Sequence, residues 1–170
     1  MGRWRPKGIP ASKYITAEGY KKLNDELQYL WKEKRPAVTQ AVQEAAAQGD
    51  RSENAEYIYG KKQLREIDRR VRFLSKRLDD MTVVDRLPED QSRVFFGAWV
   101  ELENDEGETE TYRLVGPDET DAKKHYISID APLARALLKK QVDDEVVVET
   151  PAGERCLFIS RIWYERGERR

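Results

Sequence analysis

The sequence of 170 residues has a single cysteine, Cys156, and a single histidine, His125. One cysteine cannot form an internal disulfide, and it cannot anchor a cysteine-based metal cluster. His125 has no evident catalytic partner, and the sequence contains no Ser/His/Asp set and no glycine-rich phosphate loop. We therefore expect a protein that is not a self-sufficient enzyme.

Long apolar runs are also missing. The N-terminal stretch "MGRWRPKGIPASKY" contains basic residues, but it lacks the apolar core of a signal peptide. No later segment is apolar enough to predict a membrane-spanning helix. We expect a soluble, cytoplasmic protein in which residues 1–13 form an N-terminal extension.

Charge is abundant but unevenly distributed. Charged residues make up 37% of the chain and hydrophobic residues 39%, and the net charge is −1. Residues 51–77 are mostly basic, whereas residues 101–121 are acidic apart from Arg113. This asymmetry predicts two modules with different partners.

The first half shows two helical patterns. Thr16 can cap a first helix, with Glu18 in its first turn, and Pro36 should kink it. Its apolar seam is predicted to run through Tyr20, Leu23, Leu27, Leu30, Lys34, Ala37 and Ala41. A second seam with alternating steps of three and four runs through Tyr57, Gly60, Leu64, Ile67, Val71, Leu74, Leu78 and Met81.

Only a few residues around Gly49 separate the two patterns, which predicts an antiparallel coiled-coil hairpin over residues 14–84. Its tip is expected at residues 48–54. An arm of about 30 residues extends roughly 45 Å at 1.5 Å per residue.

The second half changes to a period of two. Residues 85–93 are typical of a linker, and residues 94–165 predict a small, mostly antiparallel sheet. Asp130 can cap a short helix with Pro132 in its first turn, running through "LARALLKK". The expected fold class is α+β, with two domains.

The tip carries two carboxylates three residues apart, Asp50 and Glu53. One interpretation is a capping box at the start of the second helix, with Ser52 as a rival cap. The other is a working acidic pair, because carboxylates suit a hard cation such as Mg²⁺. Two carboxylates would complete such a site only with ligands from another molecule.

A basic stripe follows the second helix outside its seam: Lys62, Arg65, Arg69, Arg72 and Lys76. A solvated coiled-coil face normally mixes both signs of charge, and this line does not. Either a solvated face or sequence-independent contact with nucleic-acid phosphates fits the pattern.

Several stretches together resemble one known family, the bacterial Gre transcript cleavage factors, and most closely their GreB branch. They are "YITAEGYKKLNDELQYLWKEKRPAV", "GDRSENAEY", "KKQLREIDRRVRFLSKRL", "VFFGAWVELENDEGE", "YISIDAPLARALLKK" and "VVVETPAGE". The resemblance implies a C-terminal domain of FKBP-like fold that docks on bacterial RNA polymerase, and a coiled coil that enters its secondary channel.

By that resemblance, the factor stimulates the polymerase's own endonucleolytic cleavage of backtracked RNA. Asp50 and Glu53 would be the tip carboxylates, sharing a Mg²⁺ with the polymerase rather than binding it tightly in the free protein. The 3′ segment of the backtracked RNA would contact Lys61, Lys62, Arg65, Arg69, Arg72 and Lys76. The docking region would comprise Asp130, Ala131, Pro132, Leu133, Ala134 and Leu137.

Ala131 stands where many relatives have serine, so any contact by that hydroxyl is lost here. A monomer is expected. Two alternatives stay open, a non-cleaving Gre-like inhibitor of the polymerase and a structural coiled-coil adaptor. The intact pair of Asp50 and Glu53 argues against the inhibitor.

Overall fold

A computed structural model describes residues 11–49 and 53–165. The chain divides into two compact units, which are described separately. One unit is residues 20–81, and the other combines the chain up to Gly19 with everything from Thr82 onward. The hairpin unit is therefore shorter at both ends than the expected domain of residues 14–84.

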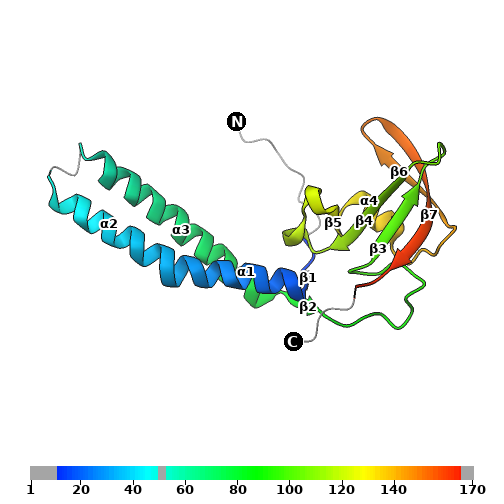
Figure 1. Ribbon diagram of the computed structural model, residues 1–170, viewed down its shortest axis with the longest axis horizontal. Helices are drawn as coiled ribbons and strands as arrows, with labels where there is room; N and C mark the ends of the chain where they lie inside the picture. Colours follow the sequence, from blue (N-terminus) through cyan, green and yellow to red (C-terminus); the bar gives the residue numbers. More distant parts are fainter. Residues whose placement is uncertain (1–10, 50–52, 166–170) are drawn as a thin grey trace. The chain divides into compact units, whose positions relative to one another are not determined.

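Apart from Met81 and the residues at its tip, the described part of the hairpin unit is helical. Its first arm contains α1 (Ala17–Tyr29), a π-helical turn η1 (Leu30–Lys34) and α2 (Arg35–Ala47). The second arm is one long helix, α3 (Ala55–Asp80), which returns beside α2 (Figure 1). The antiparallel helical hairpin predicted from the two seams is confirmed.

The π-helical turn lies directly before the expected kink at Pro36. Proline has no backbone N–H and cannot donate to the carbonyl four residues earlier, so the regular ladder is interrupted here. The Arg35 N–H instead donates to the Leu30 carbonyl, five residues back. Such a turn holds one more residue than an α-helical turn.

That extra residue shifts the apolar seam of the first arm. Ala37 and Ala41, which the sequence placed in the seam, are exposed. Val42 is buried and Val38 packs against the hairpin core, each one position later than predicted. The second seam needs no correction, because α3 is regular and buries Gly60, Ile67, Leu74 and Leu78.

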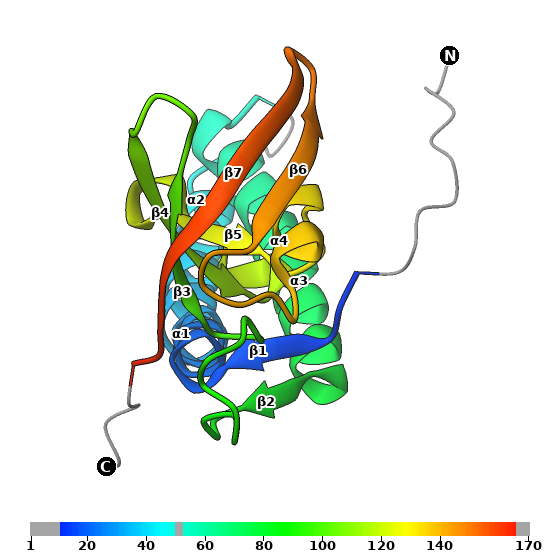
Figure 2. The ribbon, with the colours of Figure 1, turned by 90° about the vertical axis from the view of Figure 1, so that its right-hand side faces the viewer.

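The globular unit contains two sheets. β1 (Tyr14–Thr16) and β2 (Thr82–Val84) form a short parallel pair. A five-stranded sheet has the order β5-β4-β3-β7-β6 (Figure 2). Its strands are β3 (Trp99–Glu103), β4 (Thr109–Val115), β5 (Tyr126–Ser128), β6 (Glu145–Thr150) and β7 (Gly153–Trp163).

The larger sheet is mixed rather than purely antiparallel. The two expected hairpins, β3–β4 and β6–β7, are present and antiparallel. β5 pairs with β4 in parallel, because the connection crosses over through two single-turn helices, η2 (Pro117–Glu119) and η3 (Ala122–Lys124). A long connection of this kind is what parallel neighbours require.

One continuous core holds the globular unit together. It is formed by alternate residues of the strands and by the short helix α4 (Pro132–Leu137), which packs on β6. Its buried members are Val94, Ala98, Val100, Leu102, Leu114, Ile129, Ala134, Leu137, Val146, Val148, Leu157 and Ile159.

Candidate functional site

The tip of the hairpin is built from the ends of α2 and α3. α2 ends at Ala47, and Gly49 follows with a backbone φ of 152°. Residues other than glycine rarely adopt this backbone conformation. Asp50 and Ser52 lie outside the described residues. Glu53 is described, and its side chain is exposed just before α3.

The residue that caps α3 is Asn54, not Asp50 or Ser52. The Asn54 side-chain oxygen accepts a hydrogen bond from the Tyr57 N–H at 3.2 Å, and the helix begins at Ala55. Glu53 therefore precedes the cap and is not the third residue of a capping box. The capping interpretation is wrong for Glu53, because the neighbouring amide already serves the first turn of α3.

Asn54 has a second role that the sequence did not reveal. Its side-chain amide donates to the Ala45 carbonyl in the last turn of α2 at 2.7 Å. A single side chain thus caps one helix and satisfies a terminal carbonyl of the other. The signal in the sequence was an asparagine directly before "AEYIYG", a favoured cap residue at the start of a helical pattern.

The basic stripe lies on the solvent side of α3. All six residues predicted to contact RNA are exposed: Lys61, Lys62, Arg65, Arg69, Arg72 and Lys76. The five residues of the basic stripe, from Lys62 to Lys76, follow one another at steps of three and four residues on one helix face, away from the buried seam, and Lys61 directly precedes them.

Two acidic residues of the hairpin, Asp68 and Glu26, are paired with arginines outside the basic stripe. Arg35 of α2 donates through Nε to Asp68 at 2.8 Å. Glu26 of α1 accepts two hydrogen bonds from the Arg70 guanidinium, at 2.7 and 3.0 Å. The bond from Arg70 lowers the pKa of Glu26 below its usual value. These pairs cross the hairpin, so Asp68 does not neutralise the stripe.

The expected docking segment is only partly accessible. Ala134 and Leu137 are completely buried in the core of the globular unit, so their side chains cannot contact a partner in this structure. Pro132 is exposed, while Asp130 and Leu133 are half-buried. Helical periodicity explains this difference in burial, because a helix that packs on a sheet turns one face toward the core and the other toward solvent.

The predicted cap of this helix is also corrected. Ala131, not Asp130, occupies the cap position, and α4 ends at Leu137 instead of continuing through the lysines. The Asp130 carboxylate accepts a hydrogen bond from the Ser12 N–H at 2.8 Å. It therefore anchors the chain before β1 rather than starting the helix.

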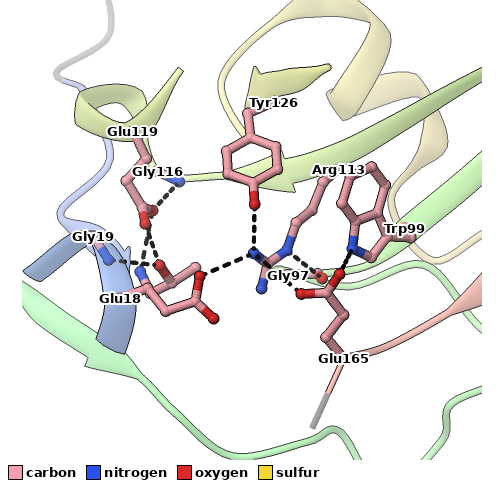
Figure 3. Close-up of polar contacts among 10 residues, drawn as sticks. Glu18, Gly19, Gly97, Trp99, Arg113, Gly116, Glu119, Tyr126 and Glu165 are labelled. Atoms are coloured by element: carbon pink, nitrogen blue, oxygen red, sulfur yellow. Dashed lines mark hydrogen bonds and ion pairs between the residues drawn. The ribbon is translucent and has the colours of Figure 1, made fainter. Parts of the chain in front are cut away.

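Thr16 and Glu119 fix the start of α1 within the globular unit. Figure 3 shows Glu119 beside Gly19 and Gly116. The Thr16 hydroxyl accepts from the Gly19 N–H at 3.0 Å, which confirms the predicted cap, and it donates to Glu119. Glu119 also accepts from the Thr16 N–H at 3.1 Å and the Gly116 N–H at 2.8 Å. A Cβ on Gly19 would lie 2.0 Å from the Glu119 carboxylate, so a larger residue here would displace the Glu119 side chain.

Arg113 forms the other half of this anchor (Figure 3). It is only 6% exposed, and its Nη1 donates to the Tyr126 hydroxyl at 3.3 Å. Carboxylates of Glu18 and Glu165 lie 3.8 and 3.9 Å from the same nitrogen. The sequence marked Arg113 only as the single base in an acidic segment, and gave no sign that it is buried.

Potential metal ligands do not cluster in residues 11–49 and 53–165. These residues contain no group of three or more His, Cys, Asp or Glu side chains that could hold a metal ion. Within the same ranges, no helix combines the length and apolar character needed to cross a membrane.

Comparison with known proteins identifies the family. The profile described as "Transcription elongation factor, N-terminal" matches residues 13–83, and "Transcription elongation factor, GreA/GreB, C-term" matches residues 89–164. The chain belongs to the GreA/GreB family of transcription elongation factors. The two matched regions together span nearly all of the described chain.

Individual relatives are similar over almost their whole length. A protein of Haemophilus influenzae named "Transcription elongation factor GreB" is 63% identical, covering 91% of this chain and 98% of the relative. The protein of the same name from Pseudomonas aeruginosa is 59% identical, covering 96% and 98%. A third, from Vibrio vulnificus, is 60% identical, covering 92% and 99%.

Proposed function

We propose that this protein stimulates the cleavage of backtracked RNA by bacterial RNA polymerase and so returns arrested complexes to elongation. The relatives that match across nearly the whole chain carry the name "Transcription elongation factor GreB". The observation that supports a cleaving role is the position of Glu53. Its carboxylate is exposed at the tip and is not used as the cap of α3.

Glu53 and Asp50 suit a shared Mg²⁺ site. Carboxylate oxygens are the ligands that Mg²⁺ prefers, and this ion usually retains waters and takes further ligands from phosphates. When bound between these carboxylates and the polymerase's own ligands, Mg²⁺ would supply an activated water and stabilise charge on the cleaved phosphate. The contribution of this chain is to present two carboxylates, with Asn54 holding the tip turn against α2.

The basic stripe supports contact with the 3′ segment of the backtracked RNA. Its five cationic side chains, and Lys61 beside them, are exposed on α3, which leads away from the tip. Contacts of lysine and arginine with phosphates do not depend on base sequence. This suits a factor that must act on any transcript.

The globular unit is proposed to dock on the polymerase. The exposed Pro132 and the half-buried Leu133 and Asp130 remain candidates for that contact. Because Ala134 and Leu137 are core residues, their part would be to hold α4 in place. The protein is proposed to act as a monomer and without an active site of its own.

The test is cleavage of end-labelled RNA in a stalled, backtracked elongation complex. Wild-type protein should release RNA fragments, and Asp50→Asn should not. Glu56→Gln is the matched control, because Glu56 is an exposed carboxylate in the first turn of α3. Competition with labelled wild-type protein measures polymerase binding separately.

The alternatives give different results. A non-cleaving inhibitor would compete for the polymerase while wild-type protein releases no RNA. A structural adaptor would neither compete nor cleave. Equal cleavage by wild type and Asp50→Asn would remove the tip carboxylate from the mechanism.

A further inference from the structure

Phe73 is an exposed aromatic side chain surrounded by positive charge. It lies on α3 and is 49% exposed, although the same helix buries Leu74 completely. On a helix, a residue is flanked by those three and four positions away. For Phe73 these four neighbours are all basic: Arg69, Arg70, Lys76 and Arg77.

One neighbour is held against the ring. The Arg70 guanidinium carbon lies 5.4 Å from the centre of the Phe73 ring, within the range of a cation–π contact. Glu26 binds the same guanidinium with both carboxylate oxygens. Arg70 is therefore fixed beside the ring, while about half of the Phe73 side chain stays open to solvent.

Phe73 also borders the basic stripe. Arg69 precedes it by four positions and Lys76 follows by three, and both belong to the stripe. A strand whose phosphates follow these cations would carry its bases past the ring. Exposed aromatic rings beside a cationic track are how proteins hold single-stranded nucleic acid without reading its sequence.

We propose that Phe73 stacks on an unpaired base of the RNA that follows the basic stripe, with Arg70 supporting the ring from its other side. This inference rests on the proposed RNA contact of α3 and adds a base contact to the phosphate contacts. Stacking tolerates every base, because each has a flat π face. The site therefore takes single-stranded RNA of any sequence.

The position of Phe73 makes the contact depend on RNA length. Ala55 begins α3 at the tip of the hairpin. At 1.5 Å per residue, Phe73 lies about 27 Å along the helix from Ala55. A short extruded segment cannot reach that far, whereas a long one can. Loss of the ring should therefore weaken the factor only on complexes with a long extruded segment.

Trp31 provides a matched control within the hairpin. It is 55% exposed, and the Arg35 guanidinium carbon lies 5.4 Å from its ring centre. Arg35 is held by Asp68, much as Arg70 is held by Glu26. Trp31 differs in lying on the other arm, in η1, away from the stripe.

The experiment measures the concentration of factor that gives half-maximal cleavage, on complexes with a short or a long extruded RNA. Phe73→Leu keeps an apolar side chain but removes the π face. It should raise that concentration roughly five- to tenfold with the long RNA and leave it unchanged with the short one. Phe73→Trp should restore wild-type behaviour, and Trp31→Leu should show no dependence on length.

Two results would overturn the stacking role. Equal weakening on both complexes would mean that Phe73 contacts the polymerase, and no weakening on either would mean that the ring has no partner. The double variant Arg65→Ala with Arg69→Ala tests the underlying RNA contact. If it shows a length-dependent loss and Phe73→Leu does not, the phosphate contacts stand and stacking fails. If neither does, the proposed RNA contact itself fails.

Discussion

The helical hairpin and the globular unit are stabilised in different ways. The hairpin buries a narrow line of side chains, centred on Leu30, Ile67 and Leu74, and leaves most of its surface exposed. The globular unit buries a continuous core to which β3, β4, β6 and β7 contribute buried side chains and β5 contributes the partly buried Ile127. Substitutions on the hairpin surface should therefore alter function with little effect on folding, whereas core substitutions in the globular unit should alter folding first.

The largest effect on stability is expected in the globular core. Leu137→Ala removes a completely buried side chain, and such truncations cost about 2–5 kcal/mol of unfolding free energy. Val147→Ala is the control, because Val147 is exposed on β6. Denaturant unfolding measures both. Similar losses for the two variants would contradict the assignment of Leu137 to the core.

The largest effect on activity is expected at the tip. Glu53→Gln should lower RNA cleavage on the order of 100-fold while changing the unfolding free energy by less than about 0.5 kcal/mol. Glu53→Asp keeps the charge but withdraws the carboxylate by one methylene, and it should also cleave poorly. Cleavage assays and denaturant unfolding check the two parts. Full cleavage by Glu53→Gln would show that the hairpin acts without this carboxylate.

Asn54 should affect both folding and activity, to a smaller extent. Asn54→Ala removes the cap and the contact with Ala45, and should cost about 1 kcal/mol. Asn54→Asp keeps an acceptor for the Tyr57 N–H but loses the donor, so it should retain the cap alone.

If Asn54 positions Glu53, RNA cleavage should be slower with both Asn54 variants than with wild type. The loss should be smaller than that caused by Glu53→Gln. Only the alanine variant should unfold more easily. Normal cleavage by Asn54→Asp would mean that the contact between Asn54 and Ala45 does not position the tip.

The smallest effect is expected for the surface pair of Glu26 and Arg70. Arg70 lowers the pKa of Glu26 in the folded protein, so the pair stabilises the hairpin above the usual glutamate pKa. That contribution is lost as the pH falls through the lower, folded value. Unfolding of wild type and Glu26→Gln should differ by less than about 1 kcal/mol near neutral pH, and the difference should shrink as the pH falls below the usual glutamate pKa. A difference that grows in acid would contradict this assignment.

The sequence predicted the hairpin well because its signals are local. The regular spacing from Tyr57 to Leu78 places each apolar side chain on one helix face, and α3 follows it, ending just before the last predicted seam residue, Met81. The capping signal of Thr16 was equally direct. Where a residue interrupts the regular ladder, as Pro36 does, the same reasoning placed Ala37 and Ala41 one position out of register.

The candidate site was predicted as a set of residues but not as an arrangement. The exposure of the five stripe residues follows from helical periodicity and is confirmed. Asn54, which caps one helix and holds the end of the other, was missed because its second partner, Ala45, becomes a neighbour only when the arms meet. The burial of Ala134 and Leu137 likewise depends on the sheet beneath α4.

By itself the sequence determined the two units, the hairpin, most of the strands and the cationic face of α3, because periodicity and composition act over short stretches of chain. Only the tertiary structure decided which groups meet across long separations. Arg113 is buried among Glu18, Tyr126 and Glu165, and Glu119 holds the start of α1. Such contacts depend on the packing of whole elements, since partners far apart in the chain leave no local pattern.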